Sequence, residues 1–135
     1  MVDFSDAKKR FEEIEGFIKN NNYKIINLTD EECILDGIIT ETSMNPYGMA
    51  HGGYIFGLAD TASGILAATL GPAVTIDSSI YYLKPLKTDS VRAISTFDKK
   101  GKNISIFSVK VYDSNNILVA TATNTYFYIN KDKNS

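Results

Sequence analysis

The feature that most constrains the fold is the stretch 45–71, which begins as a loop and continues as a long apolar segment. The turn dipeptides Asn45-Pro46 and Tyr47-Gly48 mark the loop. The apolar segment behind them contains several glycines and a single carboxylate, that of Asp60. A glycine inside a helix costs about 1 kcal/mol relative to alanine. A helix that retains so many must therefore use their small size for packing or for function.

The carboxylate of Asp60 lies on the face of this helix that carries the smallest residues. Steps of three and four residues from Gly53 give Gly57, Asp60, Gly64 and Ala67. The other faces are apolar, which predicts a helix that is buried nearly all round. An ionised carboxylate in such a place is costly unless it is paired, hydrated or used. The small residues leave room for a neighbouring backbone or a ligand to approach Asp60.

The start of the same helix suits an anion or a polarised carbonyl oxygen. Gly52 and Gly53 lie in its first turn, where backbone N–H groups have no partner within the helix. The positive end of the helix dipole adds to the attraction, and glycine lets a ligand come close to the backbone. These donors and a carboxylate two turns further on are two parts of a hydrolytic site.

The spacing of these residues resembles a known family. Asn45, Gly48, the triplet His51-Gly52-Gly53 and the tripeptide Leu58-Ala59-Asp60 form a pattern similar to that of the PaaI-type, HGG-motif acyl-CoA thioesterases of the hotdog fold. The resemblance covers nearly the whole chain. It implies hydrolysis of an acyl-CoA substrate to a free acid and CoA without a cofactor. It also implies a cytoplasmic homodimer or a dimer of dimers, that is, a homotetramer.

The resemblance assigns roles to four candidate catalytic residues, and His51 is a fifth candidate because of its place just before the helix. The backbone N–H of Gly52 polarises the carbonyl, and Asp60 of the facing subunit acts as general base or nucleophile. Asn45 helps to place water or substrate, and Ser78 assists. From strand spacing alone, Ser78 is equally well explained as a small residue that fits against the glycines. His51, the only histidine, either transfers a proton or organises the loop by hydrogen bonding.

The candidate substrate-binding residues are one glycine and four lysines: Gly53, Lys84, Lys99, Lys100 and Lys102. A solvated turn is the ordinary explanation for such lysines, whereas the resemblance favours contact with the phosphates of CoA, which lysine binds as a point charge. Tyr54, Phe56 and Tyr82 are candidates for an acyl pocket, although packing in the core explains them equally well.

Six strands are expected in addition to the long helix. Their predicted ranges are Tyr23–Leu28, Glu32–Thr40, Ala73–Leu83, Val91–Asp98, Asn103–Tyr112 and Ile117–Ile129, with polar turns between them. In the third, alternation places Val74, Ile76, Ser78, Ile80 and Tyr82 on one face.

The order of elements predicts a single α+β hotdog domain over residues 1–135. A curled antiparallel sheet is wrapped round the central helix, with the strand Ala73–Leu83 as the edge that joins two subunits. An amphipathic helix within residues 1–20 precedes the sheet and serves as a packing element or as a lid. Residues 130–135 are expected to be a frayed tail.

The composition excludes several other classes. A net charge of −2 argues against a general nucleic-acid binder. The polar residues of the apolar stretch argue against a membrane span, and residues 1–11 lack the apolar core of a signal peptide. No metal site is expected, because neither a second histidine nor a thiolate cluster accompanies His51. Cys33, the only cysteine, is expected to be buried and structural, the alternative being a nucleophilic pair with His51.

The sequence is also compatible with two rival functions. A hotdog hydratase or dehydratase also acts on acyl thioesters with a carboxylate and a histidine, but its usual pattern at the helix entry places these residues differently. A non-catalytic acyl-CoA-binding protein has no need of Asp60. Release of free thiol from acyl-CoA distinguishes both from a thioesterase.

Overall fold

The computed structural model describes residues 8–9, 11–13 and 16–129. Its elements are α2 (Gly16–Asn20), β1 (Tyr23–Leu28), β2 (Glu32–Ile38), η1 (Glu41–Ser43), α3 (Gly52–Ala68), β3 (Ala73–Tyr82), β4 (Ser90–Lys100), β5 (Ile104–Asp113) and β6 (Leu118–Tyr128). Residues 8–9 and 11–13 are also helical, in agreement with the expected N-terminal helix. Residues 1–7, 10 and 14–15 of the predicted range 1–20, and the tail 130–135, lie outside the described part.

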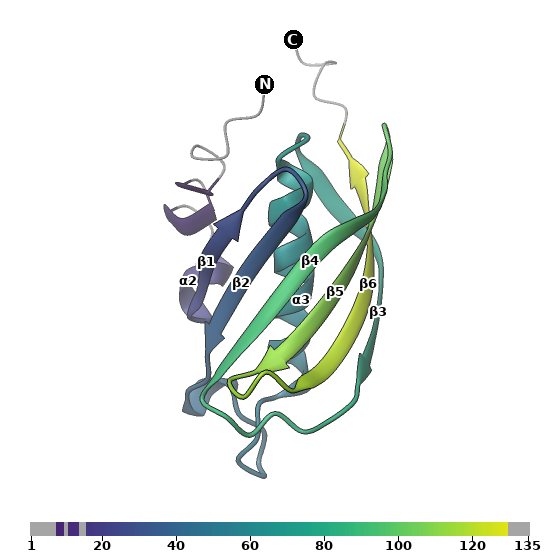
Figure 1. Cartoon of the computed structure of the whole chain (residues 1–135). Helices are drawn as coiled ribbons and strands as arrows, with labels where there is room; N and C mark the ends of the chain where they lie inside the picture. Colours follow the sequence, from purple (N-terminus) through teal and green to yellow (C-terminus); the bar gives the residue numbers. More distant parts are fainter. Residues whose placement is uncertain (1–7, 10, 14–15, 130–135) are drawn as a thin grey trace.

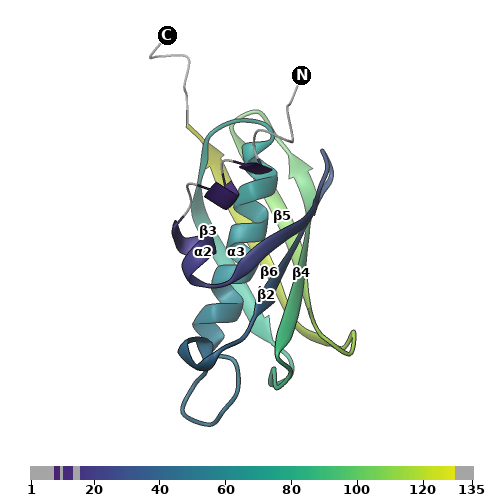
Figure 2. The ribbon, with the colours of Figure 1, turned by 90° about the vertical axis from the view of Figure 1, so that its left-hand side faces the viewer.

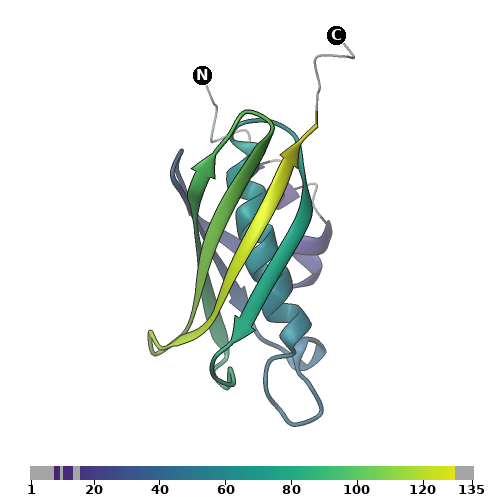
Figure 3. The ribbon, with the colours of Figure 1, turned by 90° about the vertical axis from the view of Figure 1, so that its right-hand side faces the viewer.

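The six strands form one antiparallel sheet in the order β1-β2-β4-β5-β6-β3. The sheet curls round α3, which lies along its concave side (Figures 1 and 2). Figure 3 shows β4, β5, β6 and β3 from their outer side, with the helix behind them. The predicted α+β hotdog architecture is therefore confirmed.

The core lies between α3 and the concave face of the sheet. Leu58, Ile65 and Leu66 of the helix are fully buried, as are Phe107 and Val111 of β5. At about 25 cal/mol per Å² of apolar surface removed from water, such burial is the main force that holds helix and sheet together.

The prediction that α3 is buried nearly all round is wrong on one side. Phe56 is 37% exposed and Gly53 is exposed as well, while Leu70, which is 40% exposed, lies beyond the end of the helix. In residues 8–9, 11–13 and 16–129, no helix has the length and hydrophobicity needed to cross a lipid bilayer.

Two predicted strand boundaries are also wrong. β2 ends at Ile38 rather than at Thr40, because Thr40 begins the 3-10 turn η1, where its N–H donates to Ser43 Oγ. Lys99 and Lys100 belong to β4 rather than to the turn. A bulge between Phe97 and Lys99 shifts the register, and the two lysines remain paired with β5.

A bulge in the edge strand β3 decides which of its residues face the helix. Thr75 is opposite Tyr126 and Asp77 is opposite Thr125, so Ile76 is the extra residue. The Thr75 side chain reaches Asp60 on α3, whereas Val74 and Ile76 are 47% and 53% exposed. The prediction that Val74 and Ile76 share a face with Ser78 is therefore wrong.

Candidate active site

The loop before α3 is held in shape by Asn45. Its side-chain Oδ1 accepts the backbone N–H groups of Tyr47 at 2.9 Å and Met49 at 3.1 Å. Gly48, at φ 79°, allows the tight turn between them. Within the part of the chain that the structure describes, the Asn45 amide nitrogen makes no hydrogen bond. The nitrogen is therefore the end of this side chain that is available to a ligand.

His51 is the N-cap of α3. Its Nδ1 accepts the backbone N–H of Gly53 at 2.8 Å, so Nδ1 is unprotonated. A side-chain acceptor at this position satisfies one of the free donors of the first helical turn. The geometry therefore supports the alternative in which His51 organises the loop. The same hydrogen bond occupies the Gly53 N–H, which was expected to bind substrate.

The backbone N–H of Gly52 has no acceptor among the described residues. Gly52 lines a cavity of about 330 Å³ together with Asn45, Tyr82 and Lys84. The Tyr82 hydroxyl donates to the carbonyl oxygen of Gly52 at 2.8 Å and fixes this first residue of the helix. A free N–H at a helix start, in the wall of a cavity, is suited to a polarised carbonyl oxygen.

The Asp60 carboxylate is half-buried and is held by two hydroxyl groups. Its Oδ1 accepts from Thr75 Oγ1 at 3.0 Å and from Tyr126 Oη at 2.8 Å. Burial, and then the neighbouring charge of Asp60, raise the pKa of the Tyr126 phenol, so it stays protonated. Sequence reasoning missed both hydroxyl residues. Tyr126 had a detectable signal, since it is a tyrosine on the buried face of the last strand.

Aromatic side chains fill the room that the helix glycines provide. A Cβ on Gly64 would lie 2.8 Å from Tyr126 Oη, and one on Gly57 would lie 2.9 Å from Tyr23 Oη. Within the protomer, the space beside these two glycines is therefore taken by tyrosine hydroxyl groups.

Ser78 faces the helix but makes no hydrogen bond to Asp60. Its Oγ is buried and has no partner in the described residues. In the register Ser78 is opposite Asn124, whose amide donates to Ala59 O at 3.3 Å and to Ser63 Oγ at 3.0 Å. Thr75, on the other side of the bulge, is the residue of β3 that bonds Asp60.

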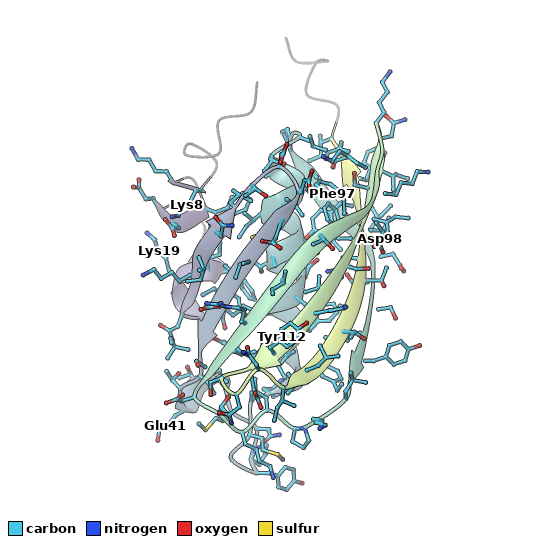
Figure 4. The ribbon with its side chains drawn as sticks, in the orientation of Figure 1. Lys8, Lys19, Glu41, Phe97, Asp98 and Tyr112 are labelled. Atoms are coloured by element: carbon cyan, nitrogen blue, oxygen red, sulfur yellow. The ribbon has the colours of Figure 1, made fainter. Side chains whose placement is uncertain are left out.

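The candidate lysines lie at two ends of one chain. Lys84 lines the cavity at the start of α3, whereas Lys102 lines a hollow beside Leu70, past the end of this helix. Figure 4 shows Phe97 and Asp98 near the end of the molecule opposite Glu41, which lies close to the loop before α3. The lysines therefore do not form one cluster within a protomer.

Lys100, at the far end, already has partners. Its Nζ donates to Asp30 O at 3.2 Å and lies 4.7 Å from the centre of the Phe97 ring. The Lys100 ammonium group is therefore engaged within its own chain.

Gly52 and Asp60 are also well separated within one chain. Eight residues of helix at 1.5 Å each amount to about 12 Å. One small reacting group cannot contact both of them on the same protomer.

Cys33 and Tyr54, two further candidates from the sequence, are both buried. Cys33 is fully buried and burial raises the pKa of its thiol to about 12, so it does not form a nucleophilic pair with the exposed His51. The Tyr54 hydroxyl donates to Asn21 O and Ile38 O, so Tyr54 packs in the core. No metal-ligating cluster of three or more His, Cys, Asp or Glu side chains occurs in residues 8–9, 11–13 and 16–129.

The chain is similar to known proteins in sequence and in fold. The family model described as "Thioesterase superfamily" matches residues 47–120. The Streptococcus mutans protein smu.793, solved bound to acetyl CoA, is 34% identical, with a TM-score of 0.79 over 87% of this chain and 94% of that one.

Two further solved structures are similar. A hypothetical thioesterase protein of Streptococcus pneumoniae, solved with coenzyme A, is 34% identical, with a TM-score of 0.76 over 80% of this chain and 86% of that one. A variant of the phenylacetic acid degradation protein PaaI of Thermus thermophilus is 28% identical, with a TM-score of 0.81 over 85% of this chain and all (100%) of that one.

Proposed function

The chain belongs to the thioesterase superfamily, and from this membership we propose that it hydrolyses acyl-CoA thioesters to a free acid and CoA. The observation that carries the proposal is the N–H of Gly52, which lies in the wall of a cavity and has no acceptor among the described residues. Two similar proteins hold CoA or acetyl CoA in their structures, which supports a CoA thioester as the substrate.

Gly52 stabilises the charge that develops during the reaction. When a nucleophile attacks the thioester carbonyl, its oxygen gains negative charge, and the Gly52 N–H donates to it. A fixed backbone donor needs little reorganisation in the transition state, so its effect there is large. The Tyr82 hydroxyl donates to the carbonyl oxygen of Gly52 and so fixes the peptide group that follows this residue.

Asp60 supplies the base or the nucleophile from a second subunit. As a base it takes a proton from the attacking water, and as a nucleophile it forms an acyl-enzyme that water then hydrolyses. In both cases the CoA thiolate leaves. The separation of about 12 Å along α3 means that Gly52 of one protomer must work with Asp60 of another.

The other candidate residues assist this pair. The Asn45 amide and the Ser78 hydroxyl help to place water or substrate, and Lys84 meets the CoA phosphates at the mouth of the cavity. His51 preorganises the start of the helix through its bond to the Gly53 N–H. A hydratase would need His51 as a proton-transfer group, and the use of its Nδ1 as a helix cap makes this second function the weaker one.

Thiol release from a panel of acyl-CoAs tests the proposal. The panel includes aromatic, short-chain and long-chain acyl groups, and the free thiol is followed with a chromogenic disulfide reagent. We expect turnover of at least one substrate. Hydration of an enoyl-CoA without thiol release, or binding without turnover of any member, contradicts the proposal.

We expect a homodimer or a dimer of dimers in solution. β3 is an edge strand with no partner on its outer side in the described sheet. It exposes Val74, Ile76, Tyr81 and Tyr82, each to at least 47%, and such an apolar edge invites pairing. Light scattering measures the mass directly, and an active monomer at assay concentration excludes a site made from two subunits.

Hybrid dimers test the shared site more sharply. Dimers of one Asp60→Asn subunit and one Gly52→Pro subunit are isolated by two different affinity tags. If each site takes Gly52 from one subunit and Asp60 from the other, a hybrid contains one intact site and one doubly altered site. We therefore expect about half of the wild-type activity per dimer, although both parent proteins are inactive. A hybrid as inactive as its parents places both residues in the same subunit's site.

A further inference from the structure

We propose that Thr75 and Tyr126 act as positioning residues that hold one oxygen of Asp60 and turn the other toward the reaction. Thr75 Oγ1 donates to Oδ1 at 3.0 Å, and the single proton of Tyr126 Oη is shared between Oδ1 and the main-chain oxygen of Asp60, each at 2.8 Å. Within the described chain Oδ2 accepts no hydrogen bond. The inference deepens the proposed function and rests on it only for the reaction, because the hydrogen bonds themselves are independent of activity.

The bulge at Ile76 is what directs the Thr75 side chain toward Asp60. β3 and β6 are paired so that Thr75 is directly opposite Tyr126, and side chains directly opposite each other in an antiparallel pair project from the same face. The extra residue lets Thr75 and Ser78 both face α3, although they are three positions apart and would project to opposite faces of a regular strand. Bulges commonly re-aim a side chain beside an active site.

Gly64 makes room for the Tyr126 hydroxyl. This hydroxyl lies within 2.8 Å of both Asp60 Oδ1 and the Asp60 carbonyl oxygen, one turn of helix before Gly64. A side chain at Gly64 would have its Cβ 2.8 Å from that hydroxyl. Gly64 and Asp60 of α3 are therefore both in contact with Tyr126 of β6, and a larger residue at position 64 would displace the phenol from the carboxylate.

Two donors on one oxygen restrict the rotation of the carboxylate. With Oδ1 fixed, the position of Oδ2 follows from the geometry of the group. A base or nucleophile that is held in one orientation gains rate because less freedom is lost when the reaction occurs. The effect of removing the hydroxyls should therefore fall on kcat rather than on KM.

Removal of each hydroxyl tests the proposal. We expect Tyr126→Phe and Thr75→Val each to lower kcat by about 10-fold, with KM changed by less than about 2-fold. Thr75→Ser, which retains the hydroxyl, should recover most of the loss. Tyr128→Phe is the matched control, because it removes a hydroxyl of the same strand that is bonded to Ser105 Oγ at 2.8 Å.

An unchanged kcat in Tyr126→Phe and Thr75→Val overturns the proposal. So does an equal loss in Tyr128→Phe, because general weakening of β6 then explains the effect. Failure of Thr75→Ser to exceed Thr75→Val also counts against it.

A double-mutant cycle gives a second readout that does not depend on activity. The urea midpoints of wild type, Tyr126→Phe, Asp60→Ala and the double variant are measured at one protein concentration. If the phenol bonds the carboxylate, Tyr126→Phe lowers the midpoint less when Asp60 is already alanine. Equal shifts in both backgrounds overturn the contact, whereas coupling without any acyl-CoA hydrolysis supports the contact and rejects the proposed function instead.

Discussion

Asp60→Asn should lower acyl-CoA hydrolysis by at least about 10²-fold while the fold is retained, since general acid–base help is worth roughly 10²–10⁴-fold. The substitution keeps the shape of the side chain. An asparagine Oδ1 can still accept from Thr75 and Tyr126 as the aspartate does. The change therefore removes the charge and the basicity of the group, and little else.

Steady-state thiol release measures the loss, and circular dichroism and thermal melting show that the variant is folded. Asp98→Asn is a suitable control, because Asp98 also accepts a hydrogen bond from a hydroxyl group, that of Ser108, at 2.6 Å. Figure 4 shows Asp98 far from Glu41 and the loop before α3. Asp98→Asn removes the same charge and should retain full activity. Near-wild-type hydrolysis by a folded Asp60→Asn protein removes Asp60 from the mechanism.

Much of the fold could be predicted because its signals are local. The run of apolar residues after the Asn45 loop predicts a helix, and α3 begins at Gly52 as expected. The strands alternate with clear turn residues between them, which is enough to order a single sheet round one helix.

The face of β3 could not be predicted from alternation. A bulge moves every later residue of the strand to the opposite face from the one that simple alternation predicts. The segment Thr75-Ile76-Asp77, where the bulge lies, has no residue type that indicates a bulge. The sequence argument therefore placed Val74 and Ile76 on the same face as Ser78 and overlooked Thr75. The bulge depends on pairing with β6, which is separated from β3 by two strands in the sequence.

The hydrogen-bond partners of Gly52 and Asp60 on α3 could not be predicted without the tertiary structure either. Tyr126 reaches Asp60 only because β6 crosses behind α3, and Tyr82 reaches Gly52 from the far end of β3. The lysines looked like one group in the sequence, yet the sheet carries Lys102 and Lys84 to different ends of the molecule. Spacing along the chain does not contain these long-range distances.

Gly52→Pro is expected to lower kcat by about 10²–10³-fold, the usual cost of losing one oxyanion donor. The structure favours a folded variant. Gly52 is the first helical residue, where proline is well tolerated, and its N–H supports no hydrogen bond in the described chain. His51, at φ −65° and ψ 139°, already has the extended conformation that precedes proline.

Gly52→Ala separates the missing N–H from the added bulk. A Cβ at this position would lie 3.3 Å from the Tyr82 ring, and both substitutions introduce it, but only proline deletes the donor. We therefore expect Gly52→Ala to lose far less activity than Gly52→Pro, with KM little changed in either, because the donor meets charge that develops during attack. Light scattering and thermal melting establish that both variants keep the mass and the fold of the wild type. If the intact proline variant keeps the wild-type kcat, the helix start is not the oxyanion site, and the Asn45 amide or the His51 side chain becomes the better candidate for that donor.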